Sequence, residues 1–264
     1  MVDVVGAFGA LCVGVDPHPA LLGRWGVGDD VSGLARFCDL CVEAFGGHVG
    51  VVKPQSAFFE RHGSGGIAVL ERLLVAFAGT GTLTILDAKR GDIGSTMDGY
   101  ADAYLAAGAP LGADAVTLSP YLGFGSLTPA LDAAAAAGRG TFALARTSNP
   151  EGGEVQLATR HGRSVAQSVV DGAAARNADA APLGDVGVVV GATHDHGLDL
   201  SALRGPVLAP GIGAQGAGPA DVARRFAGTA GIVLPAAARS VLRMGPDVGE
   251  LRTAALRLRD EIAR

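Results

Sequence analysis

The sequence contains very little lysine. Its 264 residues include 21 lysines and arginines together, and only Lys53 and Lys89 are lysines. An ammonium group can deliver a proton, whereas a guanidinium group effectively cannot. A chain that uses arginine almost everywhere else is therefore expected to keep these two lysines for work that arginine cannot do.

Clusters of basic residues and long apolar segments are also lacking. The formal net charge is −5, which argues against a nucleic acid or an anionic membrane as partner. The longest uncharged stretch, residues 115–131, is interrupted by Pro120 and Pro129, so it is a poor transmembrane candidate. The apolar N-terminus lacks the basic region of a signal peptide. We predict a soluble, cytoplasmic protein.

Two short motifs are compatible with metal binding, but both lack further ligands nearby. Cys38 and Cys41 form a CxxC inside a helical pattern and without a second pair, so buried free thiols are expected. His194 and His196 form an HxH without an evident third ligand. The odd number of cysteines, three, fits a reducing compartment. We predict no metal site.

Short apolar runs alternate with helical periodicity along the whole chain. Continuous rather than alternating apolar residues are typical of strands buried on both faces. The predicted strands cover residues 11–16, 49–54, 83–89, 115–120, 141–147, 186–193, 206–211 and 231–236. The predicted helices cover residues 30–45, 64–78, 95–107, 126–137, 161–177, 197–204, 219–227 and 247–262. The pattern predicts a single-domain (β/α)8 barrel over residues 1–264, with a doubly wound open sheet as the alternative.

Charged residues follow several of these strands, at the end of the barrel where enzymes of this fold place their active sites. Asp16, Lys53, Asp87 and Lys89 each lie at a strand end. Residues i and i+2 of a strand point the same way, so Asp87 and Lys89 are expected to share a face. Each ammonium group flanked by carboxylates is held in its charged form. The alternative is an ion network that merely closes the barrel.

Two loops are candidates for contacts with the rest of a substrate. The glycine-rich loop at residues 211–218 offers backbone N–H groups, and Arg239 follows the next strand, which together indicate an anion site. The segment at residues 147–156 could reach a base or close over the site.

A longer motif links the charged strand end to a known family. Asp87-x-Lys89-x-x-Asp92-Ile93-x-x-Thr96 resembles the DxKxxDIxxT signature of orotidine 5'-monophosphate decarboxylases. The segments LCVGVDPHP, VVKPQSAFFERHG, LSPYLG, RTSNP and PGIGAQG resemble the type 2 subgroup of that family. The resemblance covers nearly the whole chain, but GATHDHG departs from the expected sixth loop.

The resemblance implies a role for each matching residue. Lys89 corresponds to the proton donor and Asp87 to the carboxylate beside the departing CO2. Lys53 and Asp16 correspond to the network and ribose-binding pair. The remaining implied contacts are Asp92, Ile93 and Thr96 from a partner subunit, Ser148 for the pyrimidine, and Gln215 and Arg239 for the phosphate.

The implied activity is conversion of orotidine 5'-monophosphate to uridine 5'-monophosphate in de novo pyrimidine biosynthesis. The family resemblance implies a homodimer that acts on a small nucleotide and needs no cofactor. Two alternatives remain open from the sequence. One is a Mg²⁺-dependent sugar-phosphate lyase or aldolase with a similar strand, and the other is a non-catalytic nucleotide-binding barrel.

Overall fold

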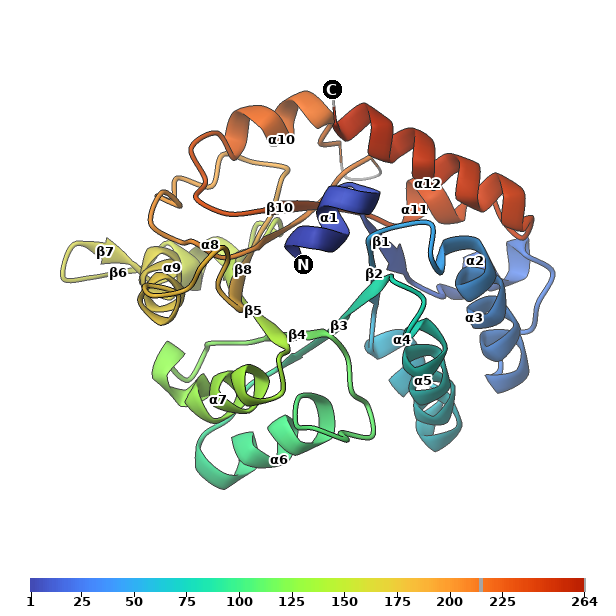
Figure 1. Cartoon of the computed structure of the whole chain (residues 1–264), viewed down its shortest axis with the longest axis horizontal. Coiled ribbons are helices and arrows are strands. Elements are labelled where there is room, and N and C mark those ends of the chain that lie inside the picture. The colour runs from blue at the N-terminus through green and yellow to red at the C-terminus, as the bar shows by residue number, and fades with distance from the viewer. Residues whose placement is uncertain (214–215, 264) are drawn as a thin grey trace.

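Eight parallel strands form a closed barrel (Figure 1). The computed structural model describes residues 1–213 and 216–263. Around the barrel, the order of the strands is β1, β10, β9, β8, β5, β4, β3 and β2, and β2 pairs with β1. Their bounds are β1 Cys12–Val15, β2 Val51–Pro54, β3 Leu83–Arg90, β4 Ala115–Leu118, β5 Gly140–Arg146, β8 Val186–Val190, β9 Val207–Pro210 and β10 Val233–Ala237. The predicted (β/α)8 barrel is confirmed, and the open sheet is excluded.

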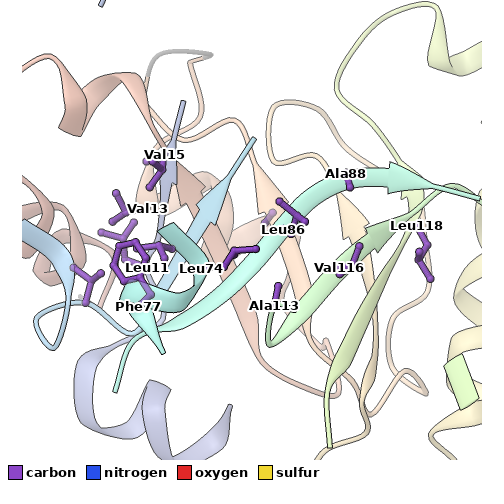
Figure 2. Packing of buried hydrophobic residues seen from close by; sticks show 14 of the residues in the cluster. Leu11, Val13, Val15, Leu74, Phe77, Leu86, Ala88, Ala113, Val116 and Leu118 are labelled. Carbon is purple, nitrogen blue, oxygen red and sulfur yellow. The ribbon is translucent and has the colours of Figure 1, made fainter. Parts of the chain in front are cut away.

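The strands are buried on both faces, as their continuous apolar sequences predict. Every residue of β1, β2, β4 and β8 is buried. Side chains from all eight strands fill the barrel interior: Cys12, Val51, Ile85, Ala115, Phe142, Val189, Leu208, Leu234 and Ala236. The opposite faces pack under the helices, where Figure 2 shows Val13, Leu86, Ala88 and Val116 among others. The filled interior leaves the ends of the strands as the place for a site.

Seven helices of the ring correspond to predicted helices (Figure 1). They are α3 Val31–Phe45, α5 Gly63–Phe77, α6 Gly94–Tyr104, α7 Thr128–Ala136, α9 Val165–Arg176, α10 Pro219–Arg225 and α12 Val248–Ile262. The side chains of Asp30, Ser164 and Asp247 accept hydrogen bonds from backbone N–H groups three residues later. These caps fix where α3, α9 and α12 begin. Among the described residues, no helix is both long and apolar enough to cross a membrane.

Several short elements were not predicted. They are α1 Val2–Phe8, α2 Pro19–Arg24, α4 Ala57–Glu60, η1 Phe124–Leu127, α8 Gly152–Gln156, β6 Thr159–Arg160, β7 Arg163–Ser164 and α11 Arg239–Leu242. Met1, directly before α1, and Val5 within it pack against the cluster inside the barrel. This helix therefore covers the amino-terminal end of the barrel (Figure 1).

Two predicted helices were wrong in whole or in part. Residues 197–204 form turns and irregular structure. There the side chain of Asp199 accepts from the backbone N–H of Ser201, and Gln167 bonds both backbone groups of Asp199, so side chains replace helical hydrogen bonds. The helix expected from residue 161 begins at Val165 instead, because the β6–β7 hairpin occupies its predicted first turn.

Candidate active site

A cavity of about 550 Å³ opens at the carboxyl-terminal end of the barrel. Six of the predicted site residues line it: Asp16, Lys53, Asp87, Lys89, Ser148 and Arg239. They come from the ends of five different strands or the loops that follow them. The fold thus brings together residues that are far apart in the sequence, at the end of the barrel that the sequence predicted.

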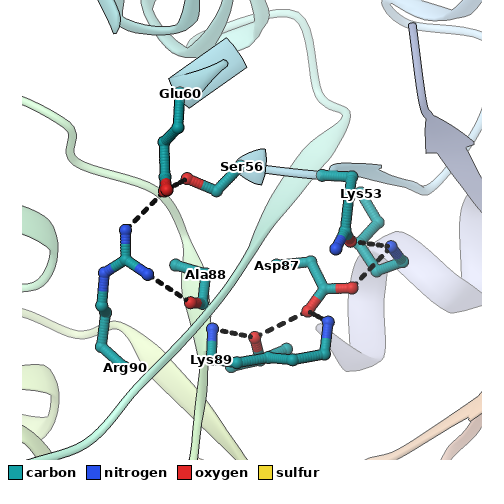
Figure 3. Close-up of polar contacts among 9 residues, drawn as sticks. Lys53, Ser56, Glu60, Asp87, Ala88, Lys89 and Arg90 are labelled. Carbon is teal, nitrogen blue, oxygen red and sulfur yellow. Dashed lines mark hydrogen bonds and ion pairs between the residues drawn. The ribbon is translucent and has the colours of Figure 1, made fainter. Parts of the chain in front are cut away.

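Asp87 connects the two lysines of the chain (Figure 3). Its Oδ2 lies 2.9 Å from Nζ of Lys53, and its Oδ1 lies 2.6 Å from Nζ of Lys89. Burial alone would raise the pKa of the Asp87 carboxyl, but the two ammonium groups outweigh burial and hold this pKa at about 2. Asp87 is therefore ionised at neutral pH and holds both ammonium groups beside the cavity.

The two lysines differ in their surroundings. The side chain of Lys53 is 9% exposed, whereas that of Lys89 is 43% exposed. Burial alone would lower the pKa of Lys53, but Asp87 and Asp16 raise it well above its ordinary value. Lys53 is thus a fixed positive charge in the wall of the site, and Lys89 is the ammonium group that a ligand can reach.

Asp16 presents a carboxylate with unused hydrogen-bonding capacity. Its Oδ1 is buried and finds no hydrogen-bond donor among the described residues. Burial raises the pKa of the Asp16 carboxyl, although the positive charge of Lys53 opposes this shift. A buried acceptor without a donor is costly, and a ligand hydroxyl group in the cavity could satisfy it.

Strand β3 departs from regular pairing at Asp87 and Lys89. The pairing of β3 with β4 shifts between Leu86 and Arg90, so residues 87–89 lie opposite the single residue Thr117. Lys89 has a φ of 49°, in the left-handed region that residues other than glycine rarely adopt. Asp87 and Lys89 do meet, but through a β-bulge rather than through the regular alternation expected from sequence.

A second polar cluster lies on the other side of this bulge (Figure 3). Nη1 of Arg90 donates to the backbone oxygen of Ala88 at 2.9 Å, and the same guanidinium group pairs with Glu60. Ser56 donates to the Glu60 carboxylate at 2.5 Å. The Arg90 guanidinium lies 5.9 Å from the ring centroid of Tyr100 in α6. These contacts connect the bulge to α4 and α6, and the sequence analysis did not anticipate them.

Asp92, Ile93 and Thr96 do not line the cavity of their own chain. Oδ1 of Asp92 accepts from the backbone N–H of Ile93 at 2.8 Å, just before α6 begins. Ile93 is 62% exposed, and Thr96 is also exposed. The signature motif is therefore divided: Asp87 and Lys89 line the cavity, and Asp92, Ile93 and Thr96 do not.

The cavity is also lined by two residues that the sequence predicted to contact the remainder of a nucleotide. Ser148 follows β5, and Arg239 begins α11 directly after β10. Gln215, the predicted second phosphate ligand, lies outside the described residues. The charged pair of Asp87 and Lys89 and the guanidinium group of Arg239 thus belong to the same cavity, as a ligand with reacting and anionic parts requires.

Sequence reasoning missed three polar residues of the site. His18 and Gln55 line the cavity, and Oε1 of Gln55 accepts from Nζ of Lys53 at 3.4 Å. Thr117 contacts Asp87 from β4. A signal for Thr117 was present, because it is a polar residue in an otherwise apolar strand, AVTL.

His196 and the two cysteines of the CxxC motif have structural explanations. Nε2 of His196 lies 2.8 Å from the backbone oxygen of Arg225, and its Nδ1 accepts from the N–H of Leu198 at 3.0 Å. Both ring nitrogens of His196 are thereby occupied. Cys38 and Cys41 are buried free thiols, as predicted. Within the described residues, no group of three or more His, Cys, Asp or Glu side chains is placed to hold a metal ion.

A (β/α)8 barrel with a charged cavity at the carboxyl ends of its strands defines a class of barrel enzymes. The sequence model of the orotidine 5'-phosphate decarboxylase / HUMPS family matches residues 9–254, and the chain belongs to this family. The family expected from the DxKxxDIxxT motif is thus confirmed.

Known relatives are similar over most of their length. The chain is 59% identical over 252 residues to an orotidine 5'-phosphate decarboxylase of Salinispora arenicola, with 95% of this chain and 91% of the relative covered. It is 56% identical over 259 residues to one of Streptomyces coelicolor, with 96% and 92% covered. A crystal structure from Streptomyces avermitilis, assigned to the same activity, superposes with a TM-score of 0.93 at 54% identity, with 99% of this chain and 92% of that chain covered.

Proposed function

We propose that this chain removes CO2 from C6 of orotidine 5'-monophosphate and so produces uridine 5'-monophosphate, the decarboxylation step of pyrimidine biosynthesis. The observation that supports this most strongly is the arrangement of Lys53, Asp87 and Lys89 at the cavity. The names of the relatives that are 56–59% identical point to the same reaction.

In this proposal Lys89 performs the central step. Loss of CO2 leaves a carbanion at C6 without an adjacent π system to delocalise the charge. The exposed ammonium group of Lys89 stabilises that charge as it develops and then donates a proton to C6. Lys53 is nearly buried, so it serves instead to keep Asp87 ionised.

Asp87 has two roles in the same proposal. It orients Lys89 through the 2.6 Å contact and keeps the ammonium group charged. It also places a negative charge beside the carboxylate of the substrate, and this repulsion is relieved when CO2 leaves. The low pKa of Asp87 supports this role, because a protonated acid would supply neither effect.

The rest of the substrate is bound by groups that do not react. The buried Oδ1 of Asp16 accepts from a ribose hydroxyl, Ser148 contacts the pyrimidine amide, and Arg239 binds the phosphate together with Gln215. Binding energy from the phosphate helps to organise the reacting groups. The enzyme needs no metal ion or organic cofactor in this scheme.

We also propose a homodimer in which Asp92, Ile93 and Thr96 complete the site of the partner. None of these three residues lines the cavity of its own chain. The loops after β3 and β4 lie together, since the N–H of Ser119 donates to the oxygen of Arg90 at 2.7 Å. These loops expose the large apolar residues Ile93, Tyr121 and Leu122, which are 62%, 79% and 52% exposed.

The test of this proposal is turnover of orotidine 5'-monophosphate by purified protein, followed as the loss of orotate absorbance after exhaustive chelation. Full activity in EDTA is expected. Activity that disappears in EDTA and returns with Mg²⁺ would favour the lyase or aldolase alternative. Nucleotide binding without turnover would favour a binding protein.

A further inference from the structure

Thr117 occupies the position opposite the β-bulge that carries Asp87 and Lys89. It is the one residue of β4 that faces residues 87–89 of β3, because the register shifts there. Its side chain is almost completely buried, with 1% of the residue exposed. The bulge disrupts the regular backbone pairing of β3 with β4, and the hydroxyl group of Thr117 takes the place of a backbone acceptor for the N–H of Lys89.

The Thr117 hydroxyl group makes two hydrogen bonds whose directions are determined. The backbone N–H of Lys89 donates to Oγ1 of Thr117 at 3.0 Å. Oγ1 in turn donates to Oδ1 of Asp87 at 2.8 Å, since an ionised carboxylate can only accept. The same Oδ1 accepts from Nζ of Lys89 at 2.6 Å. The ammonium group of Lys89 therefore contacts Oδ1 of Asp87 directly. The backbone N–H of Lys89 is connected to the same oxygen through the hydroxyl group of Thr117.

We propose that Thr117 is a positioning residue for the reaction: its hydroxyl group holds the backbone of Lys89 in the left-handed conformation and fixes the carboxylate of Asp87. The inference rests on the proposed function, because it names the residue that sets the geometry of the proposed proton donor. Thr117 does not line the cavity, so it acts through Asp87 and Lys89 rather than on the substrate.

The conformation of Lys89 explains why such a residue is needed. A lysine at a φ of 49° is strained and persists only when its surroundings enforce it. From the opposite side of β3, Arg90 binds the oxygen of Ala88 at 2.9 Å and restrains the bulge there. Without the Thr117 hydroxyl group, the N–H of Lys89 loses its partner and the lysine can relax towards other conformations.

A set of three variants separates the hydroxyl group from the shape of the side chain. Thr117→Val keeps the branched shape but removes the hydroxyl group, and Thr117→Ser keeps the hydroxyl group. The matched control is Thr141→Val in β5, which is also 1% exposed but whose Oγ1 has no hydrogen-bond partner among the described residues. Thermal unfolding establishes that each variant is folded.

Steady-state kinetics with orotidine 5'-monophosphate provide the first readout. Thr117→Val is expected to lower kcat about 10- to 100-fold, the range for losing hydrogen bonds to a charged group, while KM changes less than about threefold. Thr117→Ser should recover most of kcat, and Thr141→Val should match the wild type. A Thr117→Val enzyme with wild-type kcat, or equal losses in the valine and serine variants, would overturn the proposal.

The scarcity of lysine allows a second readout that needs no activity. Protein labelled with [15N]lysine gives backbone amide signals from Lys53 and Lys89 alone. Thr117→Val should accelerate hydrogen exchange of the Lys89 amide at least about tenfold, because this amide loses its acceptor, and should leave the Lys53 amide unchanged. Unchanged exchange at Lys89 would refute the positioning role. Failure of the wild type to decarboxylate the substrate would instead refute the proposed function.

Discussion

Lys53 and Lys89, the two lysines of the chain, bind different oxygens of one carboxylate, Asp87, at 2.9 and 2.6 Å. This relationship gives a physical reason for lysine rather than arginine at these two positions. Lys53 is the buried counter-charge that keeps Asp87 ionised, and Lys89 is the accessible ammonium group beside the cavity. An arginine could replace the charge of either residue, but not the compact ammonium group that, in the proposed mechanism, donates a proton from Lys89.

Asp87→Asn should abolish turnover and destabilise the protein by about 3 kcal/mol at neutral pH, because two ammonium groups lose their buried partner. The folded-state pKa of Asp87 is about 2, below its ordinary value of 3.8. Its stabilising contribution is therefore present above the ordinary pKa and is lost as the pH falls towards 2. Urea unfolding at several pH values should show the difference between wild type and variant shrinking over that range. The exposed Asp179→Asn is the control, and a constant difference would contradict the assignment.

Asp16→Asn should have opposite effects on stability and on binding. The raised pKa of Asp16 means that its charge opposes folding once the pH exceeds the ordinary value of 3.8. The variant should thus melt at a higher temperature than the wild type at pH 7, and this gain should vanish in acid below that value. KM should rise about tenfold or more if Asp16 binds a ribose hydroxyl. A variant that melts lower at pH 7 would contradict the interpretation, and Asp39→Asn in α3 is the control.

Arg239→Ala should weaken the nucleotide selectively. A charge-assisted hydrogen bond to phosphate corresponds to about 10- to 100-fold in affinity. The Kd of uridine 5'-monophosphate is expected to rise by that factor, whereas binding of uridine, which lacks the phosphate, should change little. Arg243→Ala, which alters an exposed arginine four residues later, should affect neither ligand. Equal losses for nucleotide and nucleoside would place the phosphate elsewhere.

Mixed dimers test where Asp92 acts. Lys89→Ala and Asp92→Ala should each be inactive, but exchange of their subunits should restore activity. If each site takes Lys89 from one chain and Asp92 from the other, one site of every mixed dimer is intact. Random exchange makes about half of the dimers mixed, so roughly a quarter of all sites should recover. No recovery after demonstrated exchange would contradict the shared site.

Much of the fold could be predicted from sequence because its signals are local. Continuous apolar runs identified the buried strands, and the helices expected from residues 30 and 247 do begin there, at Val31 and Val248. The segment at 197–204 failed because long-range side-chain contacts, such as that of Gln167 with Asp199, satisfy its backbone. Helical periodicity cannot report such contacts.

Several residues that the sequence singled out line one cavity, but the geometry that joins them was not predicted. Strand ends and the family motif placed Asp87 and Lys89 correctly at the cavity. The bulge between them depends on the register of β4, and Thr117 became visible as a contact only when both strands were in place. The position of Asp92 outside the cavity lining likewise depends on the turn before α6.

The most direct test of the account is replacement of Lys89 in the enzyme that is otherwise intact. Lys89→Ala should lose essentially all turnover of orotidine 5'-monophosphate but remain folded and still bind uridine 5'-monophosphate. Lys89→Arg should be equally inactive, because its guanidinium group keeps the charge but does not release the proton. We therefore expect that a positive charge at position 89 does not support turnover unless the group can also transfer a proton. Substantial turnover by Lys89→Arg would contradict it and reduce Lys89 to a counter-ion.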